Sequence, residues 1–194
     1  MGYSLNSRRP TGRRAAGVII AIAMIPLLAP VPPAVAAGTV AADVAVKAAF
    51  LYNFAKFADW PALAAGMPIA VCVVGDDRLA AALVETVGGQ MLSGHALEVA
   101  PHQEAAQWRA CHLLFIADGE VRRSAAGLES LKSLPVLTIS DGKDFAQGTG
   151  IMELFVETGR MRFAINLDSA EGSGLHLSSR LLGLAKIIRS GHGA

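Results

Sequence analysis

The stretch IAVCVVGDDRLAAALVETVGG, residues 69–89, sets the architecture of the chain. It begins with a six-residue apolar run rich in valine, which is typical of a buried strand, and continues through a turn of one glycine and two aspartates. Apolar side chains then recur at helical spacing until two glycines end the pattern: Leu79, Leu83 and Val87. The stretch therefore predicts a strand followed by a helix.

Strand and helix signals alternate along the chain on either side of this unit. Apolar runs at 112–116 and 136–139 are each followed by an aspartate, a helical pattern lies between them, and a weaker strand signal falls at 97–100. This alternation predicts an α/β domain with a doubly wound, mostly parallel sheet. The Gly-Thr-Gly at 148–150 lacks the third glycine of a dinucleotide fingerprint, so we expect a Rossmann-like sheet without a nucleotide motif.

The last part of the chain has a different pattern. Residues 151–157 and 160–167 flank Thr158 and Gly159, which predicts a C-terminal β-hairpin with a two-residue turn. Apolar residues then repeat at spacings of four, three and four, which predicts a closing helix: Leu177, Leu181, Leu184 and Ile188.

Residues 1–36 have the features of a secretory signal peptide. Four arginines and no acid precede an apolar run at 17–29, and the AVA at 34–36 has the small-x-small pattern of a cleavage site. The apolar run is short and contains proline, so we expect export and cleavage, with an uncleaved anchor as the alternative. Residues 37–194 then form a single exported domain.

Composition of the remaining chain argues for a protein that does not bind nucleic acid. Without the four leader arginines it has 13 basic residues against 16 acidic ones, so it is mildly acidic. No basic run with interleaved aromatic residues remains. Its two cysteines, Cys72 and Cys111, are expected to pair in an oxidising compartment. Zinc binding and thiol exchange are weaker alternatives, because the spacing matches no zinc motif and there is no CxxC.

Acids follow three of the predicted strands: Asp76, Asp77, Asp118 and Asp141. Because ligands bind outside the carboxyl ends of the strands of an open α/β sheet, these acids are candidates for lining a ligand crevice. The alternative is that they cap the helices that follow, and we favour it. The five histidines have no metal-ligand spacing, and no nucleophile motif is present. We therefore expect no catalytic residue, metal or cofactor, and no enzyme activity.

The first segment after the leader, KAAFLYNFAKFADWP at 47–61, is unusually aromatic. Small and aliphatic side chains recur at spacings of four and three from residue 44 to residue 58, which predicts a helix that packs on its own sheet. Phe50, Phe54 and Phe57 form a second, adjacent stripe, and Trp60 follows. Either another helix of the domain, such as the C-terminal one, covers these aromatics, or part of this surface is a dimer or partner interface.

Segments along nearly all of residues 37–194 resemble the YfiR family of periplasmic proteins, also called DUF4154. They are KAAFLYNF at 47–54, DWP at 59–61, CVVGD at 72–76, CHLLFI at 111–116, VLTISD at 136–141, RFAINLD at 162–168 and SSRLL at 178–182.

This resemblance implies a non-catalytic regulator in the periplasm. The best-known member binds the periplasmic sensor domain of an inner-membrane diguanylate cyclase and holds it inactive, which lowers cyclic-di-GMP and biofilm formation. A peptidoglycan-binding outer-membrane lipoprotein can sequester that member, which is a homodimer. Cys72 and Cys111 match one disulfide of the family, whereas a second pair has no counterpart between Phe145 and Phe155. Redox sensing through a second bridge is therefore not expected.

The resemblance leaves one alternative of a different class. A periplasmic small-ligand receptor that acts on a membrane sensor kinase would use the crevice at the strand ends. A deep pocket at those acids would favour the receptor, and an apolar patch would favour the interaction module.

Overall fold

The structure, a computed structural model, describes residues 35–60, 63–101 and 104–189 of the chain. These described residues belong to one compact unit. The predicted leader lies outside the described residues except for its last two, which are the first residues of a helix. The leader and its cleavage therefore stay predictions.

The helical segments alternate with strands, as the sequence predicts. The α-helices are α1 (Val35–Phe57), α2 (Asp77–Val87), α3 (Asp118–Val121), α4 (Ala125–Glu129), α5 (Leu167–Gly172) and α6 (Ser179–Leu182), and the 3-10 helices are η1 (Ala105–Ala110) and η2 (Phe145–Gln147). None of the described helices combines the length and hydropathy needed to span a bilayer.

The strands form one large sheet and one small one. They are β1 (Ala58–Asp59), β2 (Ile69–Val74), β3 (Met91–Leu92), β4 (His95–Pro101), β5 (Leu113–Ile116), β6 (Leu137–Ser140), β7 (Met152–Glu157), β8 (Arg160–Asn166), β9 (His176–Leu177) and β10 (Lys186–Ile188). The large sheet has the order β10-β8-β7-β6-β5-β2-β4-β3, and β1 pairs with β9. Its central pairs are parallel, which confirms the predicted α/β class.

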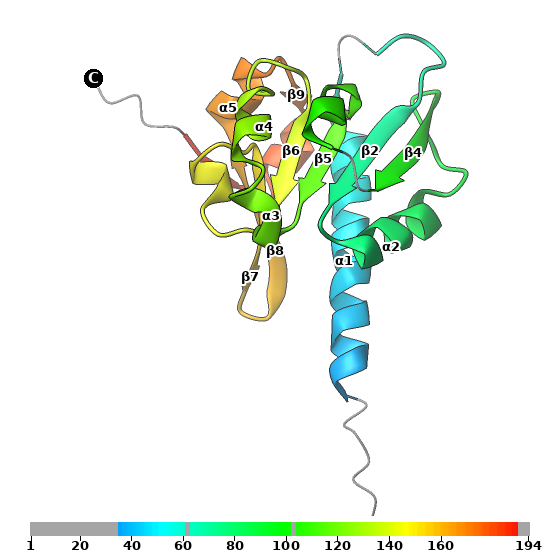
Figure 1. Ribbon diagram of the computed structural model, residues 1–194, viewed down its shortest axis with the longest axis vertical. Helices are drawn as coiled ribbons and strands as arrows, with labels where there is room; N and C mark the ends of the chain where they lie inside the picture. Colours follow the sequence, from blue (N-terminus) through cyan, green and yellow to red (C-terminus); the bar gives the residue numbers. More distant parts are fainter. Residues whose placement is uncertain (1–34, 61–62, 102–103, 190–194) are drawn as a thin grey trace, which may run out of the picture. The chain divides into compact units, whose positions relative to one another are not determined.

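Both faces of the large sheet are covered, as a doubly wound sheet requires. Alternate side chains of β5 divide between two buried clusters: Leu113 and Phe115 pack with α1 and α2, whereas Leu114 and Ile116 pack with η1, α4 and η2. The helices α1 and α2 lie side by side next to β2 and β4 (Figure 1). This burial of alternating residues on two helix layers accounts for the continuous apolar runs in the sequence.

The predicted hairpin is confirmed, with Glu157 opposite Arg160 across the turn. Thr158 and Gly159 both have positive φ, of 48° and 73°. A two-residue turn of this kind matches the right-handed twist of the two strands, and it is the type I′ geometry that favours Asn or Asp followed by Gly.

The predicted closing helix is wrong beyond its first turn. Only Ser179–Leu182 is helical, Gly183 follows as the C-cap, and Lys186–Ile188 forms β10 parallel to β8. The strand gives hydrogen-bond partners to the edge of β8, and the two isoleucines in it suit a strand better than a helix. Leu184, which the helical pattern places on a buried face, is 72 % exposed.

Candidate interaction site

The two stripes predicted on the N-terminal helix are both present on α1, but they differ in burial. Ala48 and Leu51 of the first stripe are fully buried against the sheet and α2. Phe54, from the second stripe, is also buried, with 1 % of its surface exposed, whereas Phe50 and Phe57 are partly exposed. The aromatic stripe is therefore partly core and partly surface.

Phe50 and Phe54 belong to an aromatic cluster with Phe163 of β8. The ring centroids lie 5.0 Å apart for Phe54 and Phe163, 5.7 Å for Phe50 and Phe54, and 5.9 Å for Phe50 and Phe163. The planes are tilted or edge-on, which are the arrangements that aromatic quadrupoles favour. This cluster fixes the position of α1 over the hairpin.

An apolar groove of about 540 Å³ runs between α1 and α6. It is lined by Val46, Ala49, Phe50, Asn53, Phe54, Phe57, Phe163, Arg180, Leu181 and Leu184. Phe54, Phe163 and Leu181 are buried and form its floor, whereas Val46 and Leu184 on its sides are 42 % and 72 % exposed. Large apolar side chains with this much exposure around a hollow are typical of a binding surface.

A second, more polar cavity continues the groove toward the hairpin. It has a volume of about 270 Å³ and shares Phe163 and Leu184 with the groove. Lys186 lines it, as do Glu157 and Arg162, whose charged groups lie 3.6 Å apart.

Trp60, the fourth interface candidate, lies outside the groove. Its side chain is 8 % exposed, and its indole N–H donates to the backbone oxygen of His112 at 3.1 Å. The indole also meets the His112 ring edge-on, with centroids 5.8 Å apart. These contacts attach the end of the α1 segment to the start of β5.

The four candidate acids differ in their local contacts. Asp76 accepts a hydrogen bond from the Leu79 N–H at 3.0 Å, which confirms the capping interpretation for α2. Asp77 is the first residue of that helix. Asp118 is the first residue of α3, and its own backbone N–H donates to Asp141 at 2.9 Å. Asp118 therefore does not cap α3, and Asp141 bonds to the start of that helix from the end of β6.

Asp141 is also neutralised by a lysine that sequence reasoning did not connect with it. The Lys47 ammonium of α1 donates to Asp141 at 2.6 Å and lies 3.4 Å from Asp43. Burial lowers the pKa of Lys47, but the hydrogen bond and charge of Asp141 and the charge of Asp43 outweigh burial, so the pKa is raised overall. This pair joins α1 to the carboxyl edge of the sheet.

No metal site follows from these acids. Within the described residues, no cluster of three or more histidine, cysteine or acidic side chains could hold an ion. None of the cavities described in this section is lined by Asp76, Asp77, Asp118 or Asp141.

Cys72 and Cys111 form the expected disulfide between β2 and the residue that precedes β5 by two positions. Their Cα atoms are 5.9 Å apart, and both residues are 3 % exposed. The bridge lies in the second core cluster with Trp108 and Leu114. Because it is buried, reductants in solution reach it only after local opening, which favours a structural role.

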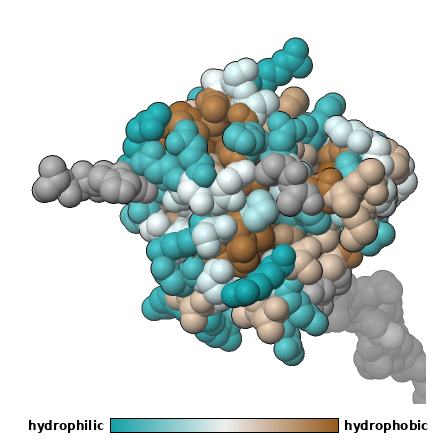
Figure 2. All heavy atoms as spheres, turned by 90° about the horizontal axis from the view of Figure 1, so that it is seen from above, coloured by the Kyte–Doolittle hydropathy of each residue, from teal (hydrophilic) through white to brown (hydrophobic). Residues whose placement is uncertain are grey.

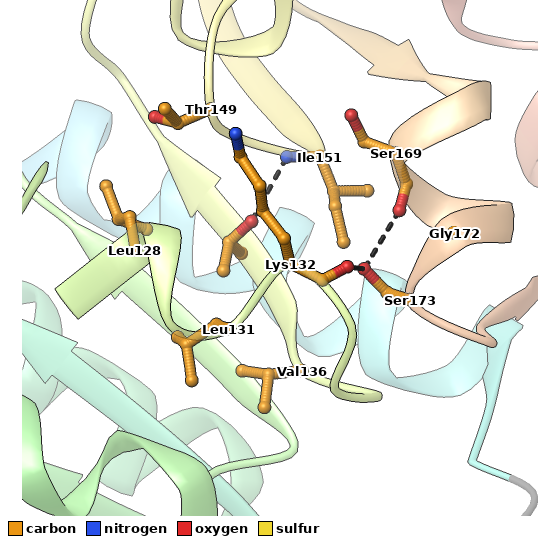
Figure 3. A pocket seen from close by; sticks show the side chains of 10 residues that line it. Leu128, Leu131, Lys132, Val136, Thr149, Ile151, Ser169, Gly172 and Ser173 are labelled. Atoms are coloured by element: carbon orange, nitrogen blue, oxygen red, sulfur yellow. Dashed lines mark hydrogen bonds between the residues drawn. The ribbon is translucent and has the colours of Figure 1, made fainter. Parts of the chain in front are cut away.

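A small cavity on the opposite helix layer is shown in Figure 3. It has a volume of about 120 Å³ and lies among residues of α4, β6 and α5. Ser173 donates to backbone oxygens of Lys132 and Ser169, and Thr138 accepts from the Ile151 N–H at 3.1 Å. These hydrogen bonds tie three segments together, so the cavity is part of the packing between them.

Apolar residues on the face drawn in Figure 2 form separate patches with hydrophilic residues between them. Separate apolar patches of this kind are normal on a protein surface. The groove between α1 and α6 is a candidate binding site because exposed apolar side chains surround a hollow there.

A family model described as YfiR/HmsC-like (DUF4154) matches residues 44–186, from within α1 to the first residue of β10. A search of curated proteins finds no match.

Proposed function

Since the chain belongs to the YfiR/HmsC-like family, whose members are periplasmic regulators of cyclic-di-GMP signalling, we propose that it represses an inner-membrane diguanylate cyclase by binding the periplasmic sensor domain of that enzyme. Repression lowers cyclic-di-GMP and with it biofilm formation. In this proposal residues 1–36 direct export and are removed, and the chain acts in the periplasm as a non-catalytic protein.

The groove between α1 and α6 is the observation that carries this proposal. A regulator that acts by contact needs an exposed, mostly apolar surface with a buried, rigid base, since affinity comes from a few well-packed anchors. Phe50 and Phe57 supply aromatic side chains on one side of the groove, and Leu184 supplies an aliphatic one on the other. Phe54 and Phe163 hold the base in place.

Repression then follows from differential binding. The cyclase has active and inactive arrangements, and the chain shifts the equilibrium only by as much as it binds the inactive arrangement more tightly. Sequestration by a peptidoglycan-binding outer-membrane lipoprotein would remove the chain and release the cyclase. A homodimer of the chain would allow it to contact both subunits of a dimeric cyclase.

The proposal is tested by recovery of the chain's partner from membranes. The mature, oxidised protein and a Cys72→Ser/Cys111→Ser variant are used as baits against a detergent-solubilised membrane fraction. We expect the oxidised protein to recover a membrane protein with a diguanylate cyclase domain, and deletion of the chain to raise cellular cyclic-di-GMP. Recovery of no membrane protein, together with unchanged cyclic-di-GMP, would contradict the proposal.

A periplasmic receptor for a small ligand, acting on a sensor kinase, is the second candidate. Its ligand would occupy the groove in place of the predicted strand-end crevice, since none of the cavities described above is lined by the four acids. The groove volume of about 540 Å³ lies within the usual range for ligand pockets, about 300–1,000 Å³. Recovery of a histidine kinase in place of a cyclase, with recovery changed by a periplasmic extract of small molecules, would favour this function.

A further inference from the structure

The groove has a direction, which follows from the spacing of its lining residues. The positions of α1 that line it are all on one stripe, at spacings of three, one, three, one and three: Val46, Ala49, Phe50, Asn53, Phe54 and Phe57. At 1.5 Å per residue this stripe extends over about 16 Å, or three helical turns. The hollow therefore follows the axis of α1.

The start of α6 bounds the opposite side of the groove near the end of α1. The backbone N–H of Ser178 donates to the Phe57 oxygen at 3.0 Å, which places the start of α6 beside the end of α1. Leu181 is buried at the base, and Leu184 stands exposed. An apolar groove that follows a helix for three turns can accept the apolar face of a second helix, because helix surfaces pack by fitting ridges into grooves.

Two basic side chains beside the groove are available to pair with an acid of a partner. Arg180 is the charged residue in the groove lining, and Lys186 lines the adjoining cavity. Neither forms an ion pair with another residue in the part of the chain that the structure describes. Glu157, the acid in the adjoining cavity, is already paired with Arg162.

We propose that the groove binds an amphipathic helix of about three turns, which inserts its apolar face between α1 and α6 and places an aspartate or glutamate opposite Arg180. The helix belongs to the membrane sensor, so this inference rests on the proposed function for the identity of that protein. Apolar anchors at spacings of three and four residues would fill the hollow over Phe54 and Phe163.

The charge of the groove disfavours a second copy of the chain as its occupant. In a symmetric dimer centred on the groove, the same surface meets itself, so Arg180 and Lys186 of one copy would approach those of the other. Like charges at an interface cost binding energy, whereas a partner acid gains from both cations.

Site-specific photo-crosslinking tests this inference in cells that make the full chain. Benzoylphenylalanine replaces Leu184, and in a control it replaces Val84, which is 54 % exposed on α2 and does not line the groove. We expect Leu184 to cross-link to a periplasmic segment whose cross-linked positions recur every three to four residues and which carries an acid. Arg180→Glu should lower the yield roughly three- to tenfold, and an acid-to-arginine change in the partner segment should restore it.

Several outcomes would overturn the inference. They are cross-links from Leu184 to a second copy alone, cross-links to a segment with alternate-residue spacing, a yield no higher than that of the Val84 control, and a yield that Arg180→Glu leaves unchanged. A different measurement shows whether the proposed function itself fails. If deletion of the chain leaves cyclic-di-GMP unchanged, the cyclase is not the target, and the spacing of the cross-links still decides whether a helix binds the groove.

Discussion

At the scale of single residues, the ionisation of His112 makes stability depend on pH. Its Nδ1 accepts a hydrogen bond from the Ala70 N–H at 3.1 Å, so the neutral ring carries its proton on Nε2. Burial lowers the pKa of His112 below its ordinary value of 6.5, and the charge of His95 lowers it further. Because the unfolded chain takes up the proton first, this contribution to stability is complete above about pH 6.5 and is lost as the pH falls below it.

We therefore predict that His112→Asn makes stability less dependent on pH. The asparagine oxygen can accept the Ala70 N–H but does not titrate. Urea unfolding at pH 7.5 and at pH 5.5 should show a smaller loss of unfolding free energy for this variant than for the parent chain. His176→Asn, at an exposed position, is the matched control and should behave as the parent does. An equal loss in the His112 variant would show that another group titrates.

Thr158 is a residue at which the sequence does not suit the backbone. It has a φ of 48° in the hairpin turn, and a β-branched side chain is strained in that region. Thr158→Asn should raise the free energy of unfolding by roughly 0.5–1.5 kcal/mol, because asparagine tolerates the left-handed conformation. Thr158→Ala is the control for loss of the branched side chain. A lower urea midpoint for the asparagine variant than for the parent would contradict this account.

Apart from the disulfide, which the presence of two cysteines predicts, the sequence predicts contacts of single residues where both partners are close in the chain. The cap at Asp76 was predictable because the acid and the N–H group that it caps are three residues apart. The Lys47–Asp141 pair joins residues 94 positions apart, so it can be recognised only once the position of α1 over the sheet is known. The capping interpretation was therefore right for Asp76 and wrong for Asp118.

At the scale of elements, α1 combines a core stripe with a surface stripe, and the two should respond differently to mutation. Phe54→Asp places a charge in a fully buried site and should lower the free energy of unfolding by at least about 3 kcal/mol. Phe57→Asp changes a partly exposed side chain and should leave the protein folded while it weakens partner recovery.

Thermal melts and the membrane pull-down measure these two effects on the same samples. Lys56→Asp is the control, because it adds an acid to the adjacent, exposed position of α1. If Phe57→Asp unfolds the protein, the stripe is core along its whole length and the groove is not a free surface. If it recovers the partner as well as the parent does, Phe57 is not part of the contact.

Elements with local signals were predictable, and those defined by their neighbours were not. The strand run at 69–74 has two buried faces and therefore reads as a continuous apolar segment. The leucine spacing at 177–188 also satisfies a helix, but the open edge of β8 and the isoleucines at 187 and 188 favour β10. Leu184, which lines the groove, lies between α6 and β10, so the helical pattern did not predict its exposure.

At the scale of the whole molecule, the disulfide is the main covalent constraint. It links residues 39 positions apart and lies in the core on the η1 and α4 side of the sheet. Removal of both sulfurs by Cys72→Ser/Cys111→Ser should lower the free energy of unfolding by about 4 kcal/mol, mainly because the unfolded chain gains freedom.

This change should leave partner binding intact wherever the variant is still folded. Urea unfolding under oxidising conditions gives the stability, and the pull-down at low temperature gives the binding. If the folded variant loses its partner, the bridge is part of recognition. A difference in stability below about 1 kcal/mol would mean that the bridge constrains the unfolded chain very little.

The central claim is that the groove between α1 and α6 holds a membrane cyclase inactive, and one measurement in cells tests it most directly. Cyclic-di-GMP is quantified in cells that lack the chain and in cells that make the parent, Leu184→Asp or Val84→Asp at equal levels. Leu184 and Val84 are both exposed, so neither change should unfold the protein. We predict that Val84→Asp represses as the parent does and that Leu184→Asp lets cyclic-di-GMP rise toward the level without the chain. Full repression by Leu184→Asp would contradict the claim.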